Sequence, residues 1–203
     1  MVEAELPKLC GDAVMLHYAR LVPRGRGTRL DDAFLSDVRA AVPDALDQLL
    51  RLPLDGVLLA CTSAGFTAPA RHPMLVTTAF DALVATLRQL RAERVVLATP
   101  YSPALTDRQA AAFASHGIGV LSGAALGRQD DLGDVTAEEI RRQVRDMPPD
   151  ALAAADALVL SCTAWPTLSL LADLETELGV PVLSSNLAMA IQASRLVPGR
   201  ALT

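Results

Sequence analysis

The feature that most constrains the fold is an internal repeat. The segment "GVLLACTSAGF" at 56–66 resembles "ALVLSCTAWPT" at 157–167, and each runs from an apolar stretch into Cys-Thr. A second matching pair follows, "PMLVTTAFDAL" at 73–83 and "PVLSSNLAMAI" at 181–191. A repeat of this kind predicts two structurally equivalent halves.

Short apolar segments alternate with amphipathic ones along the whole chain. Apolar residues recur at helical spacing over 31–50, where Pro43 predicts a break, and over 79–91. Strands that alternate with helices predict an α/β fold with parallel sheets. The expected strands are 13–22, 56–61, 73–77, 94–99, 118–122, 156–162 and 180–184.

Capping signals predict where several helices begin and end. The pairs Thr106–Gln109 and Thr136–Glu139 have the spacing of a capping box, which predicts two helix starts. Pro166 is expected to begin a further helix that ends at Gly179.

The two halves are not equally complete. The second half has four expected strands and the first has three, because the first lacks a counterpart of "RVVLATPY". Residues 3–10 are then expected to be the end of the helix that follows this opening strand, which is internal to a flavodoxin-like sheet. Either the natural chain begins upstream of Met1, or the first lobe is built unusually. Its segment after the cysteine is also shorter, by about two helical turns.

Composition excludes several classes of function. The net charge is −5 without a basic cluster, which argues against a nucleic-acid partner. No apolar run reaches a membrane span, and Glu3 and Glu5 are atypical of a signal peptide, so we expect a cytoplasmic protein. Lys8 is the one lysine, which disfavours imine chemistry. The sequence contains no Cys-x-x-Cys pair, so a structural zinc site is not expected.

The repeated Cys-Thr pairs are the best candidates for chemistry. Cys61 and Cys162 are predicted at the carboxyl ends of equivalent strands, the sheet edge where ligands of parallel sheets bind. Backbone amides and a helix start there could bind a carboxylate and lower a thiol pKa. A buried cysteine is often only a small apolar residue, but core packing does not require a repeated thiol. We therefore predict an acid–base or nucleophile pair that needs no metal or organic cofactor, and interpret Cys10 as structural.

Five segments carry a resemblance to a known family. They are "LLACTSAGF", "VVLATPYSPALTDRQAAAFASHGIGV", "SGAALGRQDD", "LVLSCTAWPTL" and "GVPVLSSNLAMAIQASRL". In this order they resemble the maleate isomerase and arylmalonate decarboxylase branch of the aspartate/glutamate racemase superfamily. The resemblance implies two pseudo-symmetric flavodoxin-like lobes with the active site in the cleft between them, and a homo-oligomer (dimer or tetramer). The expected lobes are 1–92 plus 187–203, and 93–186.

The resemblance also implies a function. It favours a cofactor-independent isomerase of a small carboxylate or dicarboxylate, with Cys61 as nucleophile and Cys162 as acid/base partner. The substrate carboxylate would be held by Thr62, Ser63, Tyr101 and Thr163. Two other activities of the superfamily stay open, an amino-acid racemase and an arylmalonate-type decarboxylase. A protein that binds carboxylates without turnover is the alternative from another class.

Two positions depart from the family pattern. The family binds substrate with an asparagine after the first strand, whereas Asn186 is the only asparagine of this chain. A second binding asparagine is replaced by Asp130 or Asp131, whose charge would repel a second carboxylate. Two further interpretations stay open: Trp165 either lines the pocket or packs in the core, and 184–186 either caps the last helix or reaches the site.

Overall fold

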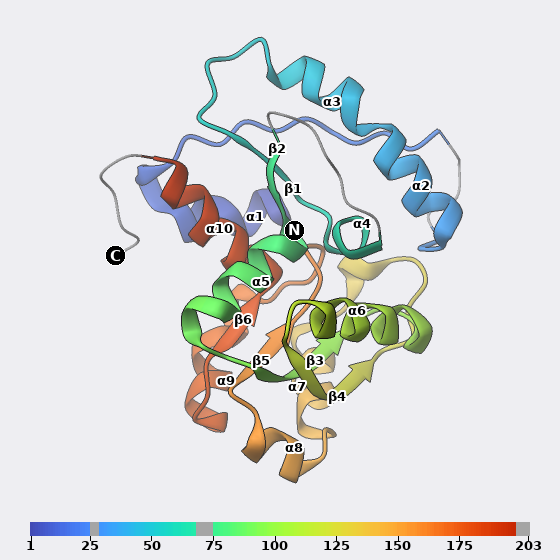
Figure 1. The fold of residues 1–203 in the computed structure, drawn as a ribbon, viewed down its shortest axis with the longest axis vertical. Coiled ribbons are helices and arrows are strands. Elements are labelled where there is room, and N and C mark those ends of the chain that lie inside the picture. The colour runs from blue at the N-terminus through green and yellow to red at the C-terminus, as the bar shows by residue number, and fades with distance from the viewer. Residues whose placement is uncertain (25–28, 68–74, 198–203) are drawn as a thin grey trace.

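Two parallel sheets, each flanked by helices, organise the chain (Figure 1). This computed structural model describes residues 1–24, 29–67 and 75–197. The strands are β1 (Val57–Leu59), β2 (Leu75–Thr78), β3 (Arg94–Thr99), β4 (Gly119–Ala125), β5 (Ala157–Leu160) and β6 (Val182–Ser184). The helices are α1 (Val2–Cys10), α2 (Asp32–Ala40), α3 (Val42–Leu49), α4 (Thr62–Thr67), α5 (Ala79–Leu90), α6 (Pro103–Ser115), α7 (Ala137–Arg145), α8 (Pro149–Ala154), α9 (Leu171–Leu178) and α10 (Ser185–Leu196).

The larger sheet has four parallel strands in the order β4-β3-β5-β6. In chain order this is 2-1-3-4, the order of a flavodoxin-like sheet. The central strand β3 pairs on both sides, with Val95 opposite Val120 and Ala157. Its residues from Val95 to Thr99 are buried, as expected for a parallel strand covered on both faces. The α/β class with parallel sheets, and the four strands of the second half, are therefore confirmed.

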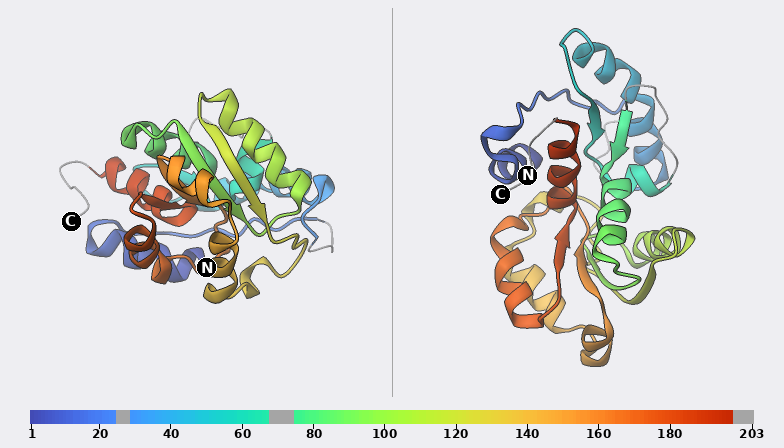
Figure 2. Two further views of the ribbon diagram at one scale, coloured as in Figure 1. Left: turned by 90° about the horizontal axis from the view of Figure 1, so that it is seen from below. Right: turned by 60° about the vertical axis from the view of Figure 1, so that its left-hand side comes forward.

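The smaller sheet consists of β1 and β2, which are also parallel and lie at one end of the larger sheet (Figure 2). The prediction of a strand at 13–22 is wrong, because residues 14–22 run without strand pairing. A cavity of about 530 Å³ is lined both by this segment, including Leu16 and Leu21, and by β1, including Leu58. A strand requires a neighbour, and in the larger sheet the corresponding neighbour is β3. Within the described residues the smaller sheet has no counterpart of β3.

Several predicted helix boundaries are confirmed. The chain breaks at Ala41, so that Pro43 lies in the first turn of α3, where its missing N–H costs nothing. Thr136 and Glu139 form the predicted capping box of α7. Gly179 ends α9 in the left-handed conformation, with φ of 70°. The predicted helix within 3–10 is α1.

Two predicted helix starts are wrong. Helix α6 begins at Pro103 with Ser102 as its cap, three residues before Thr106. The Thr106 hydroxyl instead pairs with that of Thr99, 2.6 Å away on β3, so tertiary packing uses the residue that the local pattern assigned to a cap. Pro166 does not begin a helix either. A 3₁₀ turn at Leu168–Leu170 comes first, and α9 starts at Leu171. Pro73, which the repeat aligns with Pro181, lies outside the described residues.

The last helix returns to the first part of the chain. Helix α10 follows β6 of the larger sheet and packs against both α1 and α5. The boundaries expected at 92/93 and 186/187 stay a prediction. Trp165 is fully buried in a core with Leu35, Ile140 and Leu174, which agrees with the interpretation that it packs in the core instead of lining the pocket.

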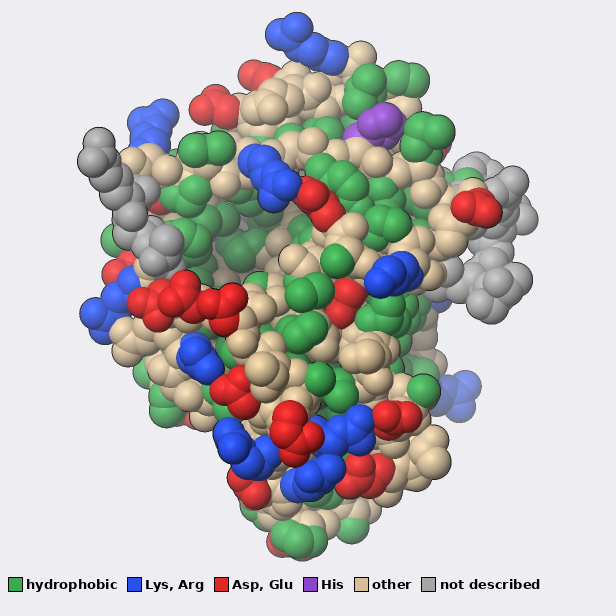
Figure 3. Space-filling view, turned by 180° about the vertical axis from the view of Figure 1, so that it is seen from behind, with side chains coloured by type: hydrophobic (Ala, Val, Ile, Leu, Met, Phe, Trp, Pro, Cys, Tyr) green, Lys and Arg blue, Asp and Glu red, His purple; other side chains and the backbone are tan. Residues whose placement is uncertain are grey.

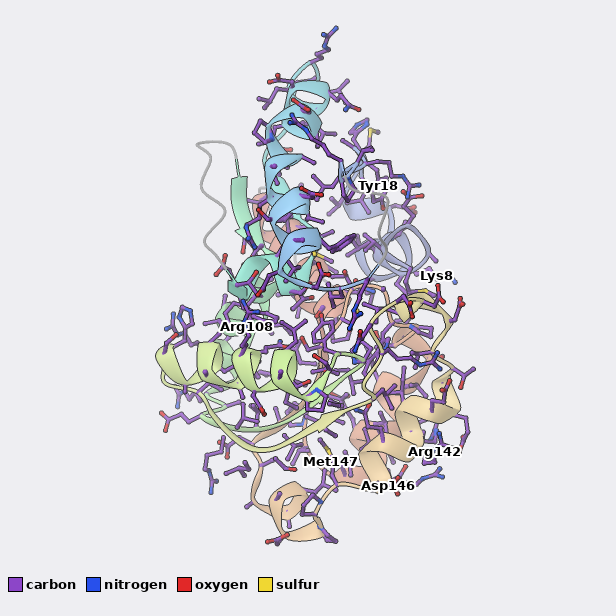
Figure 4. All side chains as sticks on the ribbon, turned by 90° about the vertical axis from the view of Figure 1, so that its right-hand side faces the viewer. Lys8, Tyr18, Arg108, Arg142, Asp146 and Met147 are labelled. Carbon is purple, nitrogen blue, oxygen red and sulfur yellow. The ribbon has the colours of Figure 1, made fainter. Side chains whose placement is uncertain are left out.

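Charged side chains form the outer surface of the larger sheet's helices. They gather over the lower half of the face shown in Figure 3, and Arg141 on α7 pairs with Asp173 on α9 at 2.9 Å. Figure 4 shows Arg142 and Asp146 pointing outward at the end of α7, whereas Met147 is buried. Among the described helices, none is long and apolar enough to cross a membrane.

Candidate active site

The two repeated cysteines come together where the two sheets meet. Cys61 follows β1 and directly precedes α4, and Cys162 follows β5. The Thr163 hydroxyl donates a hydrogen bond to the carbonyl of Ala60 at 3.2 Å, which joins the two cysteine-bearing segments. The thiols are close enough for the charge of Cys61 to raise the pKa of Cys162. The structure therefore brings the predicted pair into one site.

Cys162 is held as a thiol at neutral pH. Burial raises its pKa to about 11, although the backbone N–H of Ala164 and the hydroxyl of Tyr101 hydrogen-bond to its sulfur and act in the opposite direction. The Ala164 nitrogen lies 3.4 Å from Sγ. The expected lowering of a thiol pKa is therefore wrong for Cys162, because desolvation outweighs the donors. A protonated thiol in this position can act as an acid.

This raised pKa predicts how stability depends on pH. Below pH 9.0, the ordinary pKa of a cysteine, the Cys162 thiol is protonated in both folded and unfolded chains. As the pH rises to about 11, only the unfolded chain ionises freely, so the folded state loses stability. We expect this residue to account for a fall of about 2–3 kcal/mol in the free energy of unfolding. Urea unfolding across this window measures the fall, which Cys162→Ala should reduce; equal slopes for both proteins would contradict the assignment.

Cys61 is half-buried and its position is set by the packing of α4. Its sulfur lies 3.6 Å from the hydroxyl of Ser63, and its carbonyl accepts a hydrogen bond from Gly65 N–H at 3.2 Å. Helix α4 approaches α5 so closely that a Cβ on Gly65 would lie 2.6 Å from Oγ1 of Thr78. Thr78 is the cap of α5, so glycine is required here for α4 to present Cys61 at this depth.

Hydroxyl groups surround the two sulfurs. Oγ1 of Thr62 donates to Oγ of Ser185 at 3.0 Å, and both residues are buried. Tyr101 is 1% exposed, and its hydroxyl makes hydrogen bonds with Cys162 and Thr62. Burial raises the pKa of Tyr101 well above its ordinary value, so the phenol stays protonated and available as a donor. The six predicted site residues thus gather here, while their roles toward a substrate stay a prediction.

The segment 184–186, whose two interpretations stayed open, and Glu5 both lie near the site. Ser184 caps α10 by accepting from Leu187 N–H at 3.1 Å, which confirms the capping interpretation of this segment. Its neighbour Ser185 accepts a hydrogen bond from Thr62, so the same segment also reaches the predicted site residues. Glu5 is 5% exposed and accepts a 2.7 Å hydrogen bond from Asn186. No pattern in the sequence indicated that Glu5 is buried.

The residues that depart from the family pattern are exposed or already bonded. Asp130 and Asp131 are exposed in the segment after β4, and Asp131 has a positive φ of 48°. Asn186 is buried and donates to Glu5 and to the carbonyl of Thr163. The cavity of about 530 Å³ is lined by neither Cys61 nor Cys162, so it is separate from the two-cysteine site. In the described part of the chain, no cluster of three or more metal-ligating side chains occurs.

The fold and the site together define a class of protein: an α/β protein in which each of two parallel sheets carries a cysteine to a shared site. A family model described as arylmalonate decarboxylase matches residues 67–201. The chain belongs to this family.

Individual relatives agree with this membership. A maleate isomerase of Nocardia farcinica is 36% identical over 124 residues, which cover 60% of this chain. An arylmalonate decarboxylase of Bordetella bronchiseptica is 32% identical over 133 residues, 62% of this chain. The chain spans about half the length of these relatives, 48% and 52% respectively.

A solved structure extends the similarity over nearly the whole chain. It is the Nocardia farcinica maleate cis-trans isomerase, as a cysteine-to-serine mutant with a covalently bound succinylcysteine intermediate. The TM-score is 0.85 at 26% sequence identity, and the alignment covers 96% of this chain and 86% of that one.

Proposed function

We propose that this protein is a cofactor-independent isomerase that converts a small cis-unsaturated carboxylate, of the maleate type, into its trans isomer. The observation that carries the proposal is the pair of thiols, Cys61 and Cys162, at equivalent strand ends. Cys162 is protonated at neutral pH and lies beside the Tyr101 hydroxyl. Similarity to a maleate isomerase that forms a covalent succinylcysteine supports the same choice.

In the proposed reaction the two sulfurs have different roles. The thiolate of Cys61 adds to one alkene carbon, forming a C–S bond, while the π electrons move to the neighbouring carbon. The Cys162 thiol gives that carbon a proton, which leaves a single bond that can rotate. Cys162 then takes a proton back, the C–S bond breaks, and the trans alkene leaves with both sulfurs restored.

The surrounding donors would stabilise the charge that develops during addition. When the alkene carbon is attacked, negative charge spreads onto the adjacent carboxylate, and preorganised donors lower the barrier to that step. Tyr101 is a suitable donor because it keeps its proton. Thr62 donates to Ser185 in the present structure, so binding a carboxylate would require one of these two hydroxyls to turn toward it. Ser63 and Thr163 complete the proposed set.

Decarboxylation of an arylmalonate is the second candidate, because the family model and a Bordetella relative bear that name. By resemblance, arylmalonate decarboxylases have glycine at the first cysteine position, where this chain has Cys61. A cysteine at the position of Cys61 is not needed for decarboxylation, so its presence in this chain favours the isomerase. Racemisation would use the same two thiols symmetrically.

Proton NMR in D₂O tests these activities with the full-length protein. We expect maleate to be consumed with matching growth of fumarate. Loss of the α-proton signal from aspartate or glutamate would identify a racemase instead, and consumption of arylmalonate would identify a decarboxylase. Binding of all these compounds without any turnover would contradict the proposal. A dimeric or tetrameric assembly and a cytoplasmic location stay predictions.

A further inference from the structure

Glu5 is a buried carboxylate at the edge of the site. It projects from α1, and the residue is 5% exposed. Its partners are all neutral donors: Oε1 accepts from Leu168 N–H at 2.9 Å, and Oε2 accepts from Thr167 Oγ1 at 3.2 Å and from Asn186 Nδ2 at 2.7 Å. Among the described residues, no lysine, arginine or histidine forms an ion pair with it. Burying a carboxylate is costly unless it organises the groups around it.

Two of the three donors to Glu5 belong to the segment that follows Cys162. Thr167 and Leu168 end the turn that begins at this cysteine, and the same turn supplies the Ala164 N–H that reaches its sulfur. Asn186 extends the contact from the other side, because its Nδ2 also donates to the carbonyl of Thr163 at 3.3 Å. Glu5 is therefore bonded near both ends of the five-residue turn 163–167, directly at one end and through Asn186 at the other.

The network continues to the other cysteine. Thr163 accepts from Asn186 through its carbonyl and donates through its hydroxyl to Ala60, the residue before Cys61. A continuous set of hydrogen bonds thus joins α1 to both cysteine-bearing segments.

We propose that Glu5 is a positioning residue, whose carboxylate fixes the turn after Cys162 and so holds this thiol in register with Cys61. The inference rests on the proposed function for its kinetic consequence, but its structural part concerns the Cys162 thiol alone. Charge-assisted hydrogen bonds from three directions suit such a role, because they are stronger and more directional than neutral ones.

The test compares two substitutions on the same helix. In Glu5→Gln the side chain keeps its shape, but its amide NH₂ must face a donor that the carboxylate had accepted from. The matched control is Glu3→Gln, because Glu3 lies on α1 with an exposed carboxylate that pairs with Arg20 at 2.7 Å. Alkylation of each cysteine by iodoacetamide, followed by mass spectrometry, reads the outcome without requiring any enzymatic activity.

Cys10 provides an internal reference in the same experiment. It lies on α1 and is 3% exposed, close to the 4% of Cys162, so general loosening of α1 would speed alkylation of both. We expect Glu5→Gln to speed alkylation of Cys162 by about tenfold, the effect of weakening one charge-assisted hydrogen bond, with little change at Cys10. The pH profile of Cys162 alkylation should also move to lower pH as the thiol gains contact with water. Glu3→Gln should change neither rate.

Two outcomes decide against the inference. Unchanged alkylation of Cys162 in Glu5→Gln would overturn it, and equal acceleration of Cys10 and Cys162 would show that Glu5 only supports α1. If Glu5→Gln does not fold, Thr167→Val replaces it, because this change removes one donor and preserves shape; it should give a smaller shift in the same direction.

A kinetic measurement then separates positioning from binding. On maleate, Glu5→Gln should lower kcat by about tenfold or more while KM changes little, since a misplaced proton donor affects the chemical step. An inactive wild-type protein would count against the proposed function, whereas the alkylation comparison would still decide the role of Glu5.

Discussion

Replacing either repeated cysteine with serine is expected to lower the turnover of maleate by about a thousandfold or more, because each sulfur has a separate chemical role. The hydroxyl of serine is a much weaker nucleophile than a thiolate in place of Cys61, and a weaker acid than a thiol in place of Cys162. Steady-state NMR or absorbance assays on Cys61→Ser and Cys162→Ser measure the loss.

The two variants should differ in what they accumulate. In Cys162→Ser the Cys61 thiolate can still add and solvent can supply the proton, but serine removes that proton slowly, so the C–S bond does not break. A covalent adduct of one substrate molecule on Cys61 should therefore build up and appear by intact mass spectrometry. Cys61→Ser should form no adduct. The third cysteine supplies the control, because Cys10 lies outside the repeat and Cys10→Ala should retain activity. Full activity in both serine variants would exclude the two-thiol mechanism.

Removing the indole of Trp165 is expected to produce the largest loss of stability. The side chain is fully buried in the core beneath the site, so Trp165→Ala leaves a cavity and should lower the free energy of unfolding by about 3–5 kcal/mol. Trp165→Phe should cost much less, because the indole Nε1 has no hydrogen-bond partner to lose. Urea denaturation followed by circular dichroism gives both values.

An exposed apolar residue provides the comparison for this measurement. Met15 is 84% exposed, and Met15→Ala should change the free energy of unfolding by no more than about 0.5 kcal/mol. A loss for Trp165→Ala as small as that of Met15→Ala would mean that the core relaxes around the missing ring.

Local patterns predicted the strands of the larger sheet well, because each of these strands finds its pairing partners within that sheet. The strand β3 is apolar, bordered on both sides and followed by a helix, so sequence and tertiary context agree. The segment 13–22 has the same apolar character, yet strand formation depends on a neighbour that no local pattern can supply. Thr106 shows that tertiary packing can also override a local signal. Its type and spacing predict a helix cap, but its hydroxyl hydrogen-bonds to Thr99 on β3.

The candidate site was predictable where the repeat marked it. Cys61 and Cys162 stood out because the same dipeptide recurs at equivalent strand ends, and the structure brings them together. Glu5 could not be found in this way. Its burial depends on α1 meeting residues more than 160 positions away in the chain, and a single glutamate near a helix start normally indicates a favourable surface charge.

The cavity beside β1 has a mechanical consequence for the thiol pair. On that side β1 has no neighbouring strand within the described residues, whereas β5 is bordered by β3 and β6. Elements with fewer interstrand hydrogen bonds open locally at a lower free energy. Cys61 therefore follows a strand, β1, that should open locally at a lower free energy than β5, the strand that precedes Cys162.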